Sequence, residues 1–189
     1  MKFHYAGKYN GDENSLPQRE HPANSVPFRE PQNMKMFSVI MNILAGIIVI
    51  LFLLIASAVS EKGIFSLAGE LGILCFIITM IPHEFLHAVC FKDDIFMYQN
   101  LKQGMLFVVG TEDMSKSRFI LMCLLPNIIF GIVPFIIFLI FPDMIFLGTL
   151  GAMAISGGAG DYLNVFNCLT QVPNGAKVYM SGMHTYWHK

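Results

Sequence analysis

The stretch FSVIMNILAGIIVILFLLIASAVS, residues 37–60, carries no charge and decides the kind of fold that this chain can adopt. Wound as a helix, it spans about 36 Å, which is enough to cross the hydrocarbon core of a bilayer with some tilt. It is not a cleaved signal peptide, because a long polar arm precedes it and its apolar run exceeds the roughly 7 to 15 residues of a signal core. We therefore interpret residues 37–60 as a membrane helix.

The composition of the whole chain agrees with a membrane location. Of its 189 residues, 54% are hydrophobic and 13% are charged, whereas soluble domains have about 25% charged residues. The net charge of −1 gives no global attraction to nucleic acid. The four cysteines form no CxxC pair, so the sequence indicates neither a disulfide framework nor a zinc ribbon. We expect an integral membrane protein that is surrounded by the lipid bilayer and has no nucleic-acid partner.

Further apolar segments follow the first, and together they predict an all-α membrane protein with four transmembrane helices. The predicted spans lie at about residues 37–60, 64–91, 118–141 and 144–167. Pro126 and Pro134 fall inside the third span, and such prolines are tolerated where neighbouring helices satisfy the freed backbone groups. The spans make up a membrane domain of residues 36–169, between a polar N-terminal arm, 1–35, and a C-terminal tail, 170–189.

Short strands are expected in the polar segments. In the loop of residues 93–112, the apolar-aromatic segments 95–99 and 104–109 are separated by residues 100–103, a pattern typical of a β-hairpin. After the fourth span, residues 173–175 (PNG) predict a turn, and a strand-like segment follows at residues 176–180. We expect these segments to form a small β-hairpin or sheet on the cytoplasmic side.

Basic residues set the expected orientation, because cytoplasmic loops of membrane proteins carry an excess of Lys and Arg. They gather in the N-terminal arm, in the loop between the second and third spans and in the C-terminal tail, whereas the two tight connections hold only Lys62. Both termini and the middle loop are therefore predicted to be cytoplasmic. The arm also holds several prolines among polar residues and is expected to be extended or disordered.

The second span contains the pattern HEFLH at residues 83–87. Residues four apart stack on one face of a helix, about 6 Å apart along its axis, so His83 and His87 can converge on one tetrahedral zinc ion. Glu84 lies at the edge of that face, where its carboxylate can take a proton from a water molecule. Ionisable groups inside a span are costly and functional by default, which favours a metal site. The alternative is that the three side chains merely hydrogen-bond inside a helix bundle.

A third zinc ligand is expected at the same depth of the membrane, and Asp161 is the candidate. His83 lies about eight residues, and Asp161 about six, from the cytoplasmic end of its span, so their depths agree to within about one helical turn. A divalent metal offsets the cost of burying a lone carboxylate. Gly157, Gly158 and Gly160 remove side-chain bulk, so this backbone can approach the second span or unwind locally. Alternatively, Asp161 caps a helix or points to water at the interface.

Two other side chains of the second span are interpreted as structural. Cys90 shares a helical stripe with the histidines but lies about 10 Å from His83 along the axis, so packing is favoured over metal binding. Glu70 lies about 20 Å from His83, near the outer interface. We interpret Glu70 as a structural or interfacial charge.

Two asparagines lie at depths where they can support the centre. Asn127 follows Pro126, whose kink leaves a backbone carbonyl free. Its amide either donates a hydrogen bond to a substrate carbonyl or, as we favour, joins two helices. Asn164 lies one turn beyond Asp161 and is a candidate partner of that carboxylate.

These residues together resemble a bacterial family of small membrane proteins described as zincin peptidases. The HEFLHAV core, the hairpin loop, the Pro126–Asn127 span, the GGAGD stretch and the Pro-Asn-Gly tail carry the resemblance over roughly residues 35–182. More remotely, the chain is similar to the site-2 group of intramembrane metalloproteases, which place HExxH on one span and an Asp on a later span. The resemblance implies His83, His87 and Asp161 as zinc ligands, Glu84 as catalytic base, and a location in the bacterial cytoplasmic membrane.

The sequence thus predicts an integral-membrane zinc metallopeptidase with one zinc per chain and no other cofactor. It would hydrolyse peptide bonds of a membrane protein or membrane-bound peptide near the cytoplasmic boundary, with the substrate presented as an extended strand at the hairpin edge. The alternative is a non-catalytic membrane scaffold or immunity-type protein, with or without metal, that acts by binding a partner. A small-ion transporter is a third class, disfavoured because four spans are few for a monomeric carrier.

Overall fold

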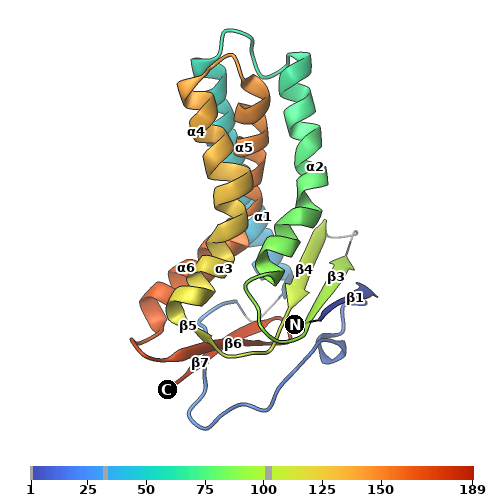
Figure 1. Ribbon diagram of the computed structural model, residues 1–189, viewed down its shortest axis with the longest axis vertical. Coiled ribbons are helices and arrows are strands. Elements are labelled where there is room, and N and C mark those ends of the chain that lie inside the picture. The colour runs from blue at the N-terminus through green and yellow to red at the C-terminus, as the bar shows by residue number, and fades with distance from the viewer. Residues whose placement is uncertain (1, 32–33, 101–103) are drawn as a thin grey trace. The chain divides into compact units, whose positions relative to one another are not determined.

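The computed structural model describes residues 2–31, 34–100 and 104–189, which are mostly helical and include two small sheets (Figure 1). The chain divides into two compact units. Unit 1 comprises Met1–Arg29, Glu84–Cys123 and Asn164–Lys189, and unit 2 comprises Glu30–His83 and Leu124–Leu163. The structure is mostly helical, as predicted, and includes helices long and apolar enough to cross a membrane. The strands are more extensive than the single hairpin or sheet expected from the sequence, because the polar segments pair with one another.

The first three predicted spans are helices long and apolar enough to cross a membrane. They run over Met36–Val59, Leu67–Ala88 and Lys116–Ile140. The first lies in α1 (Met34–Val59), and the second is α2 (Leu67–Ala88). The third joins α3 (Lys116–Asn127), the π-helical segment η2 (Ile128–Ile132) and α4 (Val133–Ile140). Apolar side chains such as Ile47 and Leu54, 60% and 64% exposed, lie along α1, as expected of a helix that faces lipid.

The fourth predicted span, residues 144–167, is not one continuous helix. α5 (Ile145–Gly157) ends at Gly158, where the backbone leaves helical geometry, and α6 (Ala159–Gln171) begins directly afterwards. At about 20 Å, α5 is shorter than the roughly 30 Å hydrocarbon core. Within the described residues, three helices rather than four therefore meet the length of a span.

Unit 2 is a bundle in which α5 packs against both α1 and α4 (Figure 1). Its core includes Phe135, Phe138 and Ile155, which are at most 7% exposed. The hydroxyl of Thr149 donates to the Gly69 carbonyl at 2.8 Å and so ties α5 to the first turn of α2.

The first sheet of unit 1 has the order β1–β3–β4. Its strands are β1 (Phe3–Lys8), β3 (Ile95–Asn100) and β4 (Met105–Val109). β3 pairs antiparallel with β4, which confirms the predicted hairpin, although residues 101–103 of its expected turn lie outside the described residues. β1 joins the other side of β3 in parallel.

The second sheet has the order β2–β7–β6–β5, and all of its pairings are antiparallel. Its strands are β2 (Val26–Pro27), β7 (His184–His188), β6 (Lys177–Ser181) and β5 (Met114–Ser115). The predicted turn at residues 173–175 and the strand after it are confirmed by β6. This strand does not join the hairpin, however, because its partners come from the end of the loop and from the C-terminal tail.

The N-terminal arm is part of both sheets through β1 and β2, with a short 3₁₀ turn, η1 (Glu13–Ser15), between them. Phe28 of the arm is 1% exposed and packs edge-to-face on Phe119 of α3, with ring centroids 6.0 Å apart. The two strands of the arm pair with segments about 90 and 160 residues away in the sequence. The local composition of the arm therefore does not predict these strands.

Candidate metal centre

The centre is built on the last two turns of α2. One ligand atom each of His83, Glu84 and His87 lies within 4.8 Å of the others. Glu84 and His87 are buried, at 8% and 6% exposure. The four-residue spacing therefore brings both imidazoles and the carboxylate together, as expected for one face of a helix.

His87 is oriented by a backbone carbonyl of α3. Its Nδ1 lies 2.8 Å from the Met122 carbonyl oxygen. A carbonyl can only accept, so Nδ1 carries a proton, and in the neutral form of the ring Nε2 is then the unprotonated nitrogen. Histidines that bind metals commonly donate their other N–H in this way.

The Met122 carbonyl is available because of Pro126. In an α-helix this carbonyl would accept a hydrogen bond from the backbone N–H four residues later, and proline has none. The Met122 carbonyl, left free by Pro126, thus accepts a hydrogen bond from His87 Nδ1. One proline on α3 thereby fixes the tautomer of a histidine on α2.

Asp161 lies beside His83 and is held by Asn127, all within unit 2. Its Oδ2 is 3.5 Å from His83 Nε2 and accepts a 2.7 Å hydrogen bond from Asn127 Nδ2. Asn127 is fully buried, and its bond joins α3 to α6, which favours the interhelical interpretation of this residue. Asp161 also lies in the first turn of α6, where the helix dipole favours a carboxylate.

The position of Asn127 depends on Gly158. A Cβ on Gly158 would lie 1.8 Å from Asn127 Oδ1, so any side chain there would displace the amide. The same Oδ1 lies 3.5 Å from the Tyr162 hydroxyl, which can donate to it. The amide oxygen thus faces Tyr162 and the amide nitrogen faces Asp161.

The structure also places the remaining sequence candidates. Asn164 is half-buried one turn further along α6, and Asn127 is one partner of the Asp161 carboxylate. The Cys90 thiol lies 3.6 Å from the Leu86 carbonyl, a local contact that agrees with its packing interpretation. Glu70 is exposed in the first turn of α2, as expected of an interfacial charge.

Sequence reasoning missed two residues that contact the chain just after α2. Glu112 is buried and pairs with Arg118, which is partly exposed, and both bond to the backbone three to six residues after His87. From the sequence, Arg118 is recognisable only as one of the basic residues that predict the orientation of the chain in the membrane. No local pattern marks Glu112, because its backbone partners lie about 20 residues earlier in the chain.

The donor set fits zinc. Two imidazole nitrogens and a carboxylate oxygen are typical ligands of catalytic zinc, although iron sites can use the same ligand types. The hydrogen bonds to His87 and Asp161 match the outer partners that usually orient such ligands.

Comparison with known proteins gives one match. The family profile described as "Putative zincin peptidase" matches residues 76–177, more than half of the chain, and this range contains all the residues of the candidate centre. No curated protein matches the chain, and no solved structure matches it.

Proposed function

Because the chain belongs to the family described as "Putative zincin peptidase", we propose that it is an integral-membrane zinc metallopeptidase. The observation that carries the proposal is the cluster of His83, Glu84 and His87 on α2, a helix apolar enough to cross a membrane. Ionisable groups persist in such a helix when they serve a function.

The proposed zinc ligands are His83, His87 and Asp161, with one zinc per chain. Three protein ligands are the number typical of a catalytic zinc site. When bound, zinc supplies Lewis acidity, which activates water near neutral pH and polarises a carbonyl group. The chain holds its ligands ready through the bond of His87 to Met122 and the bond of Asn127 to Asp161.

Glu84 is the proposed general base. It follows His83 directly and is 8% exposed, so its carboxylate is largely shielded from bulk solvent. It takes a proton from the water that attacks the peptide carbonyl, and gives a proton to the leaving nitrogen as the C–N bond breaks. Burial protects this proton from exchange with bulk water during the reaction.

Two sets of contacts support four crossings with both termini on the same side of the membrane. The arm, the middle loop and the tail fold together in unit 1, where β2 pairs with β7 and β1 pairs with β3. The two tight connections meet in unit 2, where Lys62 Nζ lies 3.2 Å from Asp143 Oδ1. We assign the fourth crossing to α5 followed by α6. The basic residues of unit 1 favour the cytoplasmic side of a bacterial membrane for both termini.

The substrate class follows from this placement. A centre near the cytoplasmic boundary of a membrane helix suits a membrane protein or membrane-bound peptide. β4 is an edge strand of its sheet, so an extended substrate segment can pair with it.

The proposal is tested first by metal content. We expect about one zinc per chain in the detergent-purified protein, and its loss in His83→Ala and Asp161→Ala. Protein purified without chelators that contains no zinc would favour the partner-binding scaffold. Zinc retained by Asp161→Ala would show that the third ligand is another residue.

The catalytic step is tested by Glu84→Gln. This variant is expected to keep zinc but lose cleavage of labelled transmembrane peptides reconstituted in vesicles. Glu70→Gln is the matched control on the same helix, since Glu70 is exposed in its first turn, and it should cleave like the wild type. Cleavage by Glu84→Gln would refute the proposed mechanism.

A further inference from the structure

The chain just after α2 is held by an arginine of α3. The last carbonyls of a helix lack partners within the helix. Arg118 Nε donates to the Cys90 carbonyl at 2.7 Å, only three residues after His87. A guanidinium at this position also complements the negative end of the helix dipole.

Glu112 completes this attachment from the other side of the guanidinium. Its Oε1 pairs with Arg118 Nη2, and its Oε2 accepts from the backbone N–H groups of Lys92 and Asp93 at 2.8 and 2.6 Å. The Glu112 side chain is 5% exposed, so its charge is tolerated only because these partners satisfy it. The pair therefore fixes the backbone from residue 90 to residue 93.

α3 holds the end of α2 at a second point one turn further on. Arg118 and Met122 are four residues apart, so they lie on one face of α3 about 6 Å apart along the axis. Arg118 holds the backbone at Cys90, and the Met122 carbonyl accepts from the His87 ring. A shift of the backbone at Cys90 would change the distance and angle of the His87 bond, and with it the direction of Nε2.

We infer that the Glu112–Arg118 pair is a positioning device for His87 and thereby sets the metal affinity of the centre. The inference rests on the proposed function, in which His87 is a zinc ligand. The two residues act through the backbone and the ring of His87. Losing such an outer partner typically weakens metal binding about 10- to 100-fold.

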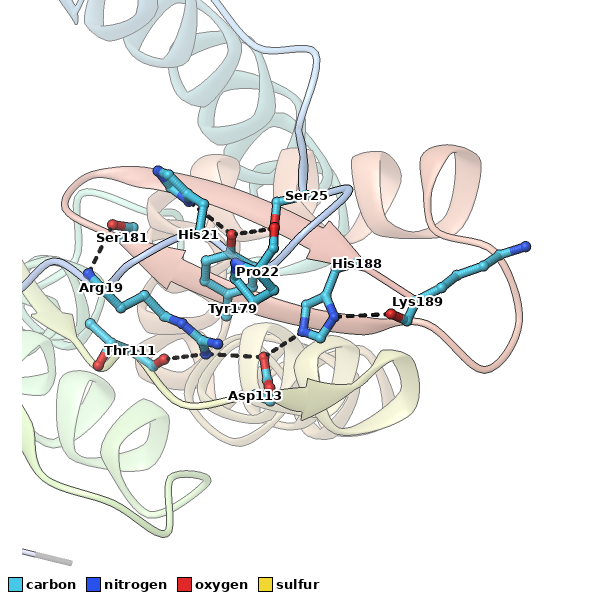
Figure 2. Close-up of polar contacts among 10 residues, drawn as sticks. All are labelled: Arg19, His21, Pro22, Ser25, Thr111, Asp113, Tyr179, Ser181, His188 and Lys189. Atoms are coloured by element: carbon cyan, nitrogen blue, oxygen red, sulfur yellow. Dashed lines mark hydrogen bonds and ion pairs between the residues drawn. The ribbon is translucent and has the colours of Figure 1, made fainter.

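The same unit offers a matched control in a second arginine–carboxylate pair, shown in Figure 2. Arg19 Nη1 donates to Asp113 Oδ1 at 3.1 Å and to the Thr111 carbonyl at 3.0 Å, and its guanidinium lies 4.3 Å from the Tyr179 ring centroid. His188 Nε2 lies 3.1 Å from the same Asp113 oxygen. The partners found for Arg19 thus come from the loop and from β6, and none of these contacts is with α2.

The experiment compares the zinc affinity of the wild type, Arg118→Lys and Arg19→Lys, using the full-length protein in detergent and a competing chromogenic chelator. Lysine keeps a charge beside each carboxylate but lacks Nε. We expect Arg118→Lys to bind zinc at least 10-fold more weakly and to change the visible absorption of bound cobalt(II), which reports ligand geometry. Arg19→Lys should stay within about twofold of the wild type.

Four outcomes would contradict the inference. A wild-type zinc affinity in Arg118→Lys would overturn the inference but not the proposed function. An equal loss of affinity in both arginine variants would indicate a general effect on folding instead of a role in positioning His87. If Arg118→Lys does not fold, Glu112→Gln decides, with the same 10-fold loss expected and wild-type affinity counting against it. A wild-type protein that binds neither zinc nor cobalt would instead overturn the proposed function, and the inference with it.

Discussion

Asn127 donates a 2.7 Å hydrogen bond to Asp161 Oδ2, the oxygen that lies 3.5 Å from His83 Nε2. An uncharged amide orients the carboxylate without neutralising it, so the negative charge stays available to a metal. The asparagine thus orients a candidate ligand that lies on a different helix.

Replacing Asn127 with Ala should therefore weaken zinc binding about 10-fold, because the Asp161 carboxylate loses the donor that fixes its rotamer. Competition titration against a chromogenic chelator measures the change. Asn164→Ala is the control, since Asn164 lies on the same helix as Asp161 one turn away, and it should stay within about twofold of the wild type. Equal losses in the two variants would show that Asn127 has no special role.

Gly158 should be intolerant of a methyl group, whereas Gly160 should accept one. A Cβ at Gly158 would lie 1.8 Å from Asn127 Oδ1, but a Cβ at Gly160 meets nothing within 4 Å. We expect Gly158→Ala to lower the free energy of unfolding by about 1–3 kcal/mol, as overpacking does, and to weaken zinc binding. Gly160→Ala should be neutral or stabilise by up to about 1 kcal/mol, because alanine favours a helix. Unfolding in detergent and zinc titration test both, and a stable Gly158→Ala with normal zinc affinity would contradict the geometry.

The elements that the sequence predicts well are those set by local composition. The charge-free run at 37–60 has sharp ends, so its predicted bounds differ from those of α1 by at most three residues. β1 and β2 could not be predicted, because their partners, β3 and β7, lie far along the chain. Hydropathy continues through the glycines of the fourth span and so predicts one continuous segment, although glycine allows local unwinding, and the helix breaks at Gly158.

The centre shows the same division between local and long-range information. The spacing of His83, Glu84 and His87 is local, and the helix brings them together as predicted. Pro126 predicts a free carbonyl, but that the carbonyl bonds to His87 depends on the packing of α3 against the end of α2. The assignment of the zinc ligands themselves stays a prediction until metal is measured.

The attachment of β1 should weaken in acid. Asp94 accepts from the His4 ring at 3.3 Å and from the Lys2 backbone N–H at 2.9 Å, and these bonds, first that of His4, lower the pKa of Asp94. A lowered pKa in the folded state stabilises the protein above the ordinary value of 3.8, and this contribution is lost as the pH falls through the folded value. Protection factors of the β1 amides in hydrogen exchange should therefore drop as the pH falls below about 4. Asp94→Asn should have low protection at every pH, and an unchanged pH profile in that variant would exclude Asp94 as the cause.

Restoring a backbone N–H at position 126 should weaken zinc binding while it strengthens the helix. In Pro126→Ala the new N–H can donate to the Met122 carbonyl and compete with His87 Nδ1, so the ring loses the bond that fixes its tautomer. We expect zinc affinity to fall about 10-fold, whereas the unfolding temperature should rise, because proline costs a helix interior about 3 kcal/mol relative to alanine. Pro134→Ala is the control, because the backbone N–H that it restores does not compete for the Met122 carbonyl that His87 uses. Its zinc affinity should match that of the wild type. Affinity and stability that fall together in Pro126→Ala would instead indicate a cavity at this buried position, and the role of the Met122 carbonyl would have to be abandoned.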